Sequence, residues 1–318
     1  MAADEAAALL GARGADETGA LFEAARGARR RAWGDEVYLY GFVYFSTYCR
    51  NNCNFCYYRR DNDIPRYRKS ESEIMRAAES LIESGVHLID LTMGEDPLYY
   101  DGGFEDVLKT AARLKAETGV PLMISPGAAG RDAIAKFAAL GVDFFALYQE
   151  TFDRELFARL RPGQDFDARL EAKAEARARG MNVEEGLLLG FGEEIMDDAD
   201  SILKMCDTGA RQLRVMTFVP RAGVPLEYAP RGCALEYNAI AVLRLLCPDA
   251  LIPASLDVEG MAGLRPRLDA GANVVTSIIP ADSGLAGVAG ADTGGRAAGE
   301  VRDILKSMGL RPARKWLI

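Results

Sequence analysis

The segment Val43–Cys56, VYFSTYCRNNCNFC, joins a short apolar run to three closely spaced cysteines. The run Val43–Tyr48 is rich in β-branched and aromatic residues and has the length of a buried strand. Outward from it, similar short apolar runs recur along the chain, as is typical of parallel strands that helices cover on both faces. The predicted strands are Val43–Tyr48, His87–Met93, Pro121–Ser125, Asp143–Tyr148, Asn182–Leu189, Gln212–Phe218, Leu251–Leu256 and Asn273–Ile278.

Amphipathic segments fill the gaps between these runs. The segment Ser70–Glu83 begins with a capping-box spacing, Ser70 and Glu73, and then carries its apolar residues on one face. Several such segments are followed by a glycine, which is typical of a helix carboxyl-terminal cap. The other predicted helices are Phe104–Glu117, Arg131–Leu140, Asp165–Arg179, Asp198–Asp207, Ala234–Cys247, Met261–Ala270 and Arg296–Met308.

This alternation of strands and helices predicts an α/β protein with a (β/α)8 TIM-type barrel over residues 37–318. Residues 1–36 are predicted to form an N-terminal helical extension, with its helical pattern over Asp4–Arg31, packed on the bottom of the barrel. An open doubly wound sheet is the alternative. Chemistry in such a barrel belongs at the carboxyl ends of the strands, so polar residues there are the candidate site residues.

Composition narrows the class of protein further. The chain has 318 residues, of which 49% are hydrophobic and 27% charged, as expected for a globular chain with a large core. Its 38 Lys and Arg against 47 Asp and Glu give a net charge of −9, which disfavours binding to nucleic acid. No apolar run is long enough to predict a membrane span, and no secretory signal is apparent. We therefore expect a cytoplasmic protein.

The three clustered cysteines follow the spacing Cys49-x3-Cys53-x2-Cys56. Three thiolates on one short loop can hold three corners of a [4Fe–4S] cluster and leave one iron open. Tetrahedral zinc would need a fourth ligand, and the single histidine, His87, begins a strand at the opposite end of the predicted barrel. The scattered Cys206, Cys233 and Cys247 are interpreted as small buried hydrophobic residues. A zinc-stabilised binding protein completed by a distant cysteine is the alternative from another class.

At these residues the sequence resembles the radical S-adenosylmethionine (SAM) superfamily, whose signature is C-x3-C-x-Φ-C with an aromatic residue before the third cysteine. Here that residue is Phe55. The resemblance implies a [4Fe–4S] cluster on Cys49, Cys53 and Cys56, with SAM on the open iron. It also implies that an electron from a reducing donor cleaves SAM to a 5′-deoxyadenosyl radical, which takes a hydrogen atom from a small-molecule substrate.

Other segments resemble the biotin synthase and hydrogenase-maturase branch of that superfamily. Gly94 and Glu95 follow the second strand and resemble the short Gly-Glu segment whose backbone meets the SAM amino group. Glu150 and Arg169 resemble the Glu and Arg that hold SAM, although Arg169 alone could be an exposed helix residue. Ser125, at the end of the third strand, is a further candidate for cofactor binding.

A second polar set is predicted for the substrate. Asp90 lies inside the second strand and Arg214 inside the sixth, where an unpaired charge costs free energy. Ser255 and Asp257 lie in and after the seventh strand. Two carboxylates with one guanidinium suit a ligand with two ammonium groups and one carboxylate, such as lysine. An internal ion pair between Asp90 and Arg214 is the alternative.

From Tyr38 to the last strand, the chain resembles the methylornithine synthase family of pyrrolysine biosynthesis. The resemblance rests on YGFVYFSTYCRNNCNFCYYRR, HLIDLTMGEDP, RVMTF and SLDVEG. It implies an isomerase that converts L-lysine to (3R)-3-methyl-D-ornithine by hydrogen abstraction, fragmentation and recombination at a different carbon. The amino acid would be held by Asp90, Arg214, Ser255 and Asp257. The alternative in the same branch acts on another amino acid derivative. The Gly-rich segment Ala281–Gly295 could help close the cavity.

Overall fold

The structure, a computed structural model, describes residues 1–227, 232–280 and 296–316; the segment Ala281–Gly295 lies outside the described residues. Within them, eight parallel strands pair in the order β6-β5-β4-β3-β2-β1-β8-β7, and a short β9 pairs with β1. Their bounds are β1 (Glu36–Ser46), β2 (Leu88–Met93), β3 (Leu122–Ser125), β4 (Phe144–Ala146), β5 (Asn182–Leu189), β6 (Gln212–Thr217), β7 (Pro253–Ser255), β8 (Val274–Ile278) and β9 (Arg311–Pro312).

The strand order follows the chain and closes from β8 back to β1, which is the topology of a (β/α)8 barrel. The remaining gap, between β6 and β7, is narrowed by a parallel bridge between Gln212 and Leu251. This arrangement confirms the predicted TIM-type barrel. The doubly wound alternative is wrong, because its strand order would reverse at a switch point in the middle of the sheet.

Strand β1 is longer than predicted, since it begins at Glu36 and ends at Ser46. The expected end at Tyr48 is wrong because the backbone N–H of Thr47 donates to the carbonyl of Tyr67, in the loop beyond the cysteines, and so leaves the ladder. Its side chains alternate as a barrel requires. The inward-facing aromatic residues are Tyr38, Tyr40, Phe42 and Tyr44, and the apolar residues packed against the outer core are Val37, Leu39, Val43 and Phe45.

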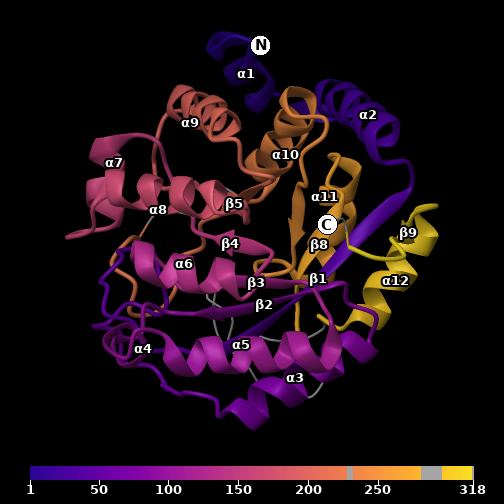
Figure 1. Cartoon of the computed structure of the whole chain (residues 1–318). Helices are drawn as coiled ribbons and strands as arrows, with labels where there is room; N and C mark the ends of the chain where they lie inside the picture. Colours follow the sequence, from indigo (N-terminus) through magenta and orange to yellow (C-terminus); the bar gives the residue numbers. More distant parts are fainter. Residues whose placement is uncertain (228–231, 281–295, 317–318) are drawn as a thin grey trace.

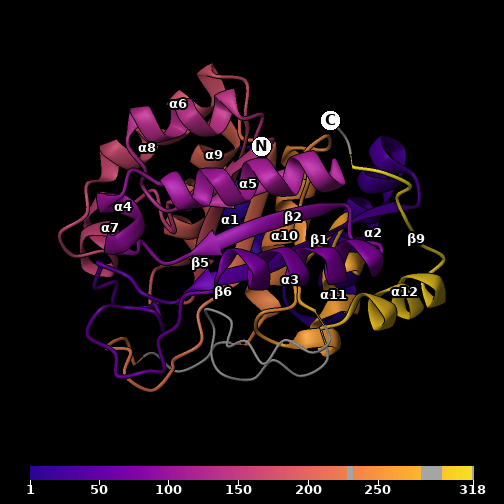
Figure 2. The ribbon, with the colours of Figure 1, turned by 60° about the horizontal axis from the view of Figure 1, so that its bottom comes forward.

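Helices surround the strands (Figure 1). In a second view, α3 and α5 lie along β1 and β2 (Figure 2). Among the described residues, no helix is long and apolar enough to cross a membrane. The helices are α1 (Ala3–Leu10), α2 (Gly14–Trp33), α3 (Glu71–Glu83), α4 (Pro97–Asp101), α5 (Glu105–Thr118), α6 (Arg131–Ala139), α7 (Arg154–Leu160), α8 (Phe166–Ala178), α9 (Ile195–Asp207), α10 (Ala234–Leu246), α11 (Leu264–Asp269) and α12 (Ala298–Ser307).

The N-terminal extension consists of two helices, α1 and α2, rather than one. Both lie mainly against the outer helices α9, α10 and α11, not across the bottom of the barrel as expected (Figure 1). The amide of Asn238 on α10 fixes them by donating to the carbonyls of Leu10 and Ala12. The bottom of the barrel is filled instead by Trp316, whose ring packs 5.3 Å from that of Tyr38 and 5.9 Å from that of Phe144.

Candidate active site

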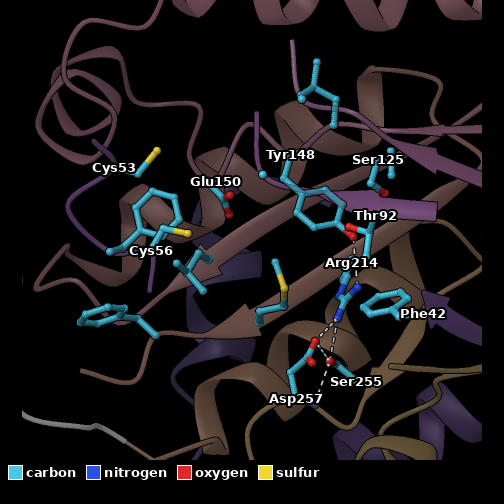
Figure 3. Close-up of a pocket in the computed structure, with 18 of the residues that line it drawn as sticks. Phe42, Cys53, Cys56, Thr92, Ser125, Tyr148, Glu150, Arg214, Ser255 and Asp257 are labelled. Carbon is cyan, nitrogen blue, oxygen red and sulfur yellow. Dashed lines mark hydrogen bonds and ion pairs between the residues drawn. The ribbon is translucent and has the colours of Figure 1, made fainter. Parts of the chain in front are cut away.

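A cavity of about 260 Å³ lies inside the barrel at the carboxyl ends of the strands. Its walls include the ends of β2, β3, β6 and β7 and the loop that follows β1. Figure 3 shows cysteines at one side of this cavity and Arg214 with Asp257 at the other. The sequence-predicted residues that line it are Cys49, Cys53, Phe55, Cys56, Asp90, Gly94, Glu95, Ser125, Glu150, Arg169, Arg214, Ser255 and Asp257.

The cysteine loop is held from two sides. On one side the guanidinium of Arg66 donates to carbonyls along the loop, among them those of Tyr58 at 2.9 Å and Arg59 at 2.6 Å. On the other side the backbone N–H of Asn54 donates to the carbonyl of Leu160, at the end of α7, at 2.8 Å. The loop has no strand pairing of its own, so these contacts hold its shape and keep the three thiols beside the cavity.

The three thiols predicted as cluster ligands all line the cavity, and thiolates are the usual ligands of a [4Fe–4S] cluster. Burial raises the pKa of Cys49 to about 11, with a further contribution from Cys53, and burial raises that of Cys56 well above its usual range. Both thiols are therefore protonated near neutral pH, and binding to iron must displace their protons. The described residues hold no group of three or more His, Cys, Asp or Glu side chains placed around a single metal-ion position.

The turn after β2 packs directly on the cysteine loop. The backbone N–H of Gly94 donates to the carbonyl of Ser46 at 3.2 Å. A Cβ at Gly94 would overlap the carbonyl oxygen of Tyr48 and lie 3.0 Å from Cβ of Cys49. Only glycine therefore allows the two backbones to approach this closely. Backbone atoms, rather than a side chain, form this part of the cavity wall.

This contact predicts that Gly94→Ala impairs cluster assembly. The added methyl group meets backbone rather than a movable side chain, so the loop bearing Cys49 must shift, at a cost of about 1–3 kcal/mol. We expect iron and sulfide content after anaerobic reconstitution to fall several-fold, and the melting temperature to drop. The control is Gly130→Ala, before α6, where an added Cβ meets none of the described residues within 4 Å. Equal iron uptake by both variants would contradict the role of Gly94.

Two ion pairs line the wall between the cysteines and the strand ends. Glu150 accepts from Arg161 at 2.5 Å, while Arg169 lies 3.7 Å from the carboxylate of Glu95. Arg169 also donates to the carbonyl of Tyr148 at 2.6 Å, so it is a buried wall residue rather than an exposed helix residue. Glu150 and Arg169, both expected to hold SAM, thus both line the cavity, and each is fixed by a different ion-pair partner.

Glu150 is held in an unusual state. Its φ of 69° is a left-handed conformation, which costs free energy for a residue other than glycine. Burial raises the pKa of Glu150 above its ordinary value, although Arg161 and Arg169 oppose this. Its Oε2 atom is buried and has no hydrogen-bond partner among the described residues. A strained, buried and unpaired acceptor at a cavity wall fits a group that hydrogen-bonds a cofactor.

Arg214 is the centre of the polar set on the other side (Figure 3). It donates to Asp257 at 2.8 Å, to Ser255 at 2.7 Å and to the hydroxyl of Tyr148 at 3.0 Å. Burial favours the neutral form of Asp257, but Arg214 and Arg296 hold the pKa of this carboxyl below its ordinary value. The Nε atom of Arg214 has no hydrogen-bond partner among the described residues, so one charged donor is left over.

Asp90 lies apart from this network. It forms no ion pair with Arg214 within 4.0 Å, so the predicted alternative of an internal pair is wrong. Its carboxylate accepts from the hydroxyl of Ser125 at 2.8 Å. Ser125, expected to bind the cofactor, lines the cavity and contacts Asp90, since register places it on β3 beside Thr92 of β2. Burial and the negative charge of Glu184 raise the pKa of Asp90 to about 8.

Some residues of the site were not anticipated. Glu184 is fully buried, lies 3.8 Å from Arg214 and accepts from the hydroxyl of Tyr40 at 3.0 Å. The sequence could have indicated Glu184, because it is a charged residue inside a buried strand, which is the pattern that indicated Asp90. Arg161 and Arg296 carried no such signal, since neither lies in a predicted strand. Only the fold brings them to Glu150 and Asp257.

A barrel whose first strand leads into a three-cysteine loop beside a cavity with charged residues at the strand ends defines the radical SAM class of enzyme. The model of the radical SAM superfamily matches residues 43–206. The 3-methylornithine synthase of Methanosarcina acetivorans is 44% identical over 315 residues, which cover 98% of this chain and 90% of that protein. The [FeFe] hydrogenase maturase subunit HydE of Thermotoga maritima is 31% identical, covering 80% and 74%.

Among solved structures, the crystal structure of methylornithine synthase (PylB) superposes with a TM-score of 0.95 at 43% identity, covering 98% of this chain and 94% of that one. The chain therefore belongs to the radical SAM superfamily and, within it, to the family of the 3-methylornithine synthases. This membership confirms an enzyme with a [4Fe–4S] cluster and SAM as cofactors. The alternative of a zinc-stabilised, non-catalytic binding protein is wrong.

Proposed function

We propose that this enzyme is the mutase that converts L-lysine into (3R)-3-methyl-D-ornithine for pyrrolysine biosynthesis. The observation that carries the proposal is a single cavity with cysteine thiols at one end and a buried guanidinium with carboxylates at the other (Figure 3). The near-full-length similarity to 3-methylornithine synthases supports it. The reaction rearranges lysine without net oxidation, so substrate and product have the same mass.

The cofactors would occupy the cysteine side of the cavity. Once bound there, the cluster and SAM supply a radical that removes a hydrogen atom from the substrate. On this proposal three thiols hold the cluster, and Gly94 offers SAM close approach to backbone. The other residues assigned to the cofactor are Phe55, Glu95, Glu150 and Arg169, and the proposal gives Ser125 to the substrate side because of its bond to Asp90.

The substrate would occupy the side of Arg214. The Nε–H of Arg214, which has no partner among the described residues, suits the lysine carboxylate, and Ser255 adds a hydroxyl close to the same guanidinium. Asp90 and Asp257 suit the two ammonium groups. Holding both ends of the molecule would keep the fragments of a cleaved side chain in place until they recombine.

The raised pKa of Asp90 predicts that lysine binding strengthens with pH. Below pH 8 the empty site keeps a proton on Asp90, and an ammonium group must displace it. The side-chain amine of lysine stays charged over this range, because it titrates near 10.4. We expect the affinity to rise by more than about tenfold between pH 6 and pH 8 and then to level off.

Isothermal titration of the reconstituted enzyme with lysine checks this, in buffers of different ionisation enthalpy that count the protons released. Asp90→Asn is the control and should bind weakly with no such pH dependence. An affinity that is the same at pH 6 and pH 8 in the unmodified enzyme would show that Asp90 does not titrate against the ligand.

The proposed function is tested by anaerobic reconstitution with iron and sulfide, followed by SAM, a reductant and isotopically labelled L-lysine. A product of unchanged mass and altered chromatographic retention supports the mutase. Deoxyadenosine without a lysine-derived product would keep the radical enzyme and favour the second candidate, an enzyme of the same branch that acts on another amino acid derivative.

In the cell we propose a reducing electron donor and a cytoplasmic location, where the cysteines remain reduced.

A further inference from the structure

The sulfur of Cys53 has surroundings that differ from those of the other two clustered cysteines. Two side chains donate to it: the amide of Gln164 at 3.0 Å and the guanidinium of Arg161 at 3.5 Å. The sulfur of Cys49 instead accepts from the backbone N–H of Asn51 at 3.4 Å. The loop between α7 and α8 thus brings two side-chain donors to one sulfur.

Both donors are fixed by partners on their other sides. Arg161 is 8% exposed, donates to Glu150 at 2.5 Å and lies 5.1 Å above the ring of Phe55. The amide oxygen of Gln164 accepts from Arg161 at 3.3 Å and from Arg169 at 3.2 Å. Because two guanidinium groups donate hydrogen bonds to this oxygen, the amide NH2 must face Cys53. Neither donor can turn away without losing its other bonds.

Hydrogen bonds to cluster sulfurs and nearby charge are among the factors that set the reduction potential of an iron–sulfur cluster. Reduction adds an electron, and N–H donors with a buried positive charge stabilise that added negative charge most where water is excluded. The guanidinium of Arg161 pairs with Glu150 at 2.5 Å, and an arginine keeps its proton even when it is buried, so its positive charge persists. Donor and charge therefore act in the same direction.

We propose that Arg161 and Gln164 are positioning residues that hold the sulfur of Cys53 and raise the reduction potential of the cluster. This makes electron entry into the cluster easier for the same donor. The inference rests on the cluster assigned in the proposed function, but it is independent of lysine as substrate.

The test compares Gln164→Met and Arg161→Met with a matched control, Arg159→Met. Arg159 lies two residues before Arg161 and is exposed. Its replacement by methionine removes the same charge, but from a position in contact with water. Each protein is reconstituted and titrated anaerobically with a reductant, without SAM or lysine, and the reduced cluster is followed by electron paramagnetic resonance. Each lost donor should shift the oxidised-to-reduced equilibrium about tenfold toward the oxidised form, which is about 59 mV for one electron.

The inference is supported if the midpoint potential becomes more negative in both the Arg161 and Gln164 variants and is unchanged in Arg159→Met. Unchanged potentials, or the same shift in Arg159→Met, would overturn it. If Arg161→Met takes up no cluster because Glu150 loses its partner, Gln164→Met and the charge-conserving Arg161→Lys decide. If Gln164→Met also takes up no cluster, the contacts of Arg161 and Gln164 with Cys53 serve cluster assembly only, and the inference is overturned. Absence of lysine turnover leaves the result unaffected, since no lysine is present.

Discussion

Replacement of Cys53 by alanine should abolish cluster assembly and, with it, SAM cleavage and product formation. Cys53 is the middle ligand of the predicted set and is 6% exposed in the wall of the cavity. Two thiols on one loop cannot replace three, and no other cysteine lines the cavity among the described residues. We expect the visible absorbance of the reconstituted protein and its iron and sulfide content to fall to background.

The matched control for this variant is Cys206→Ala. Cys206 lies on α9, outside the cavity, is partly buried and shares a hydrogen bond with Cys247. It should take up the full cluster and keep its activity. The far-ultraviolet circular dichroism of both variants should match that of the unmodified enzyme, because neither change touches a strand. Full cluster uptake by Cys53→Ala would remove Cys53 from the ligand set.

The barrel was predictable because each of its strands is a separate apolar run with covering helices on either side. Short apolar runs, glycines after helices and polar residues at strand ends all depend on neighbours in sequence. Asp90 could be found in this way, since a carboxylate inside a buried strand has few explanations. The cysteine spacing needed no tertiary information either.

Contacts between distant segments could not be predicted from such patterns. Arg66 resembles any loop arginine in the sequence, yet it organises the cysteine loop by donating to several of its carbonyls. Trp316 fills the barrel floor from the other end of the chain. The pairing of Glu150 with Arg161 depends on how the loop after α7 folds back. In each case the partner is set by packing, and the sequence supplies only the residue type.

The change of Arg214 to lysine should separate substrate binding from cluster chemistry. Arg214 carries the charge that neutralises Asp257 and Glu184 and has an unused Nε–H for a carboxylate. Lysine keeps the positive charge in this buried set, so the fold should survive, but its compact ammonium cannot form the planar fork. Hydrogen bonds to charged groups contribute about 1.5–3 kcal/mol each, so product formation at low lysine concentration should fall about 100-fold.

The measurement is product formation by mass spectrometry beside iron content and reductive SAM cleavage in the same sample. Iron content should equal that of the unmodified enzyme, and SAM cleavage should continue while the lysine-derived product falls about 100-fold. Arg211→Lys is the control, because Arg211 immediately precedes β6, at the opposite end of the strand from the cavity, where its guanidinium donates to the carbonyl of Asp249 and lies over the ring of Trp33. If Arg214→Lys kept full turnover, the carboxylate would have to be held elsewhere. If it lost iron as well, Arg214 would act on the whole barrel and not on the substrate alone.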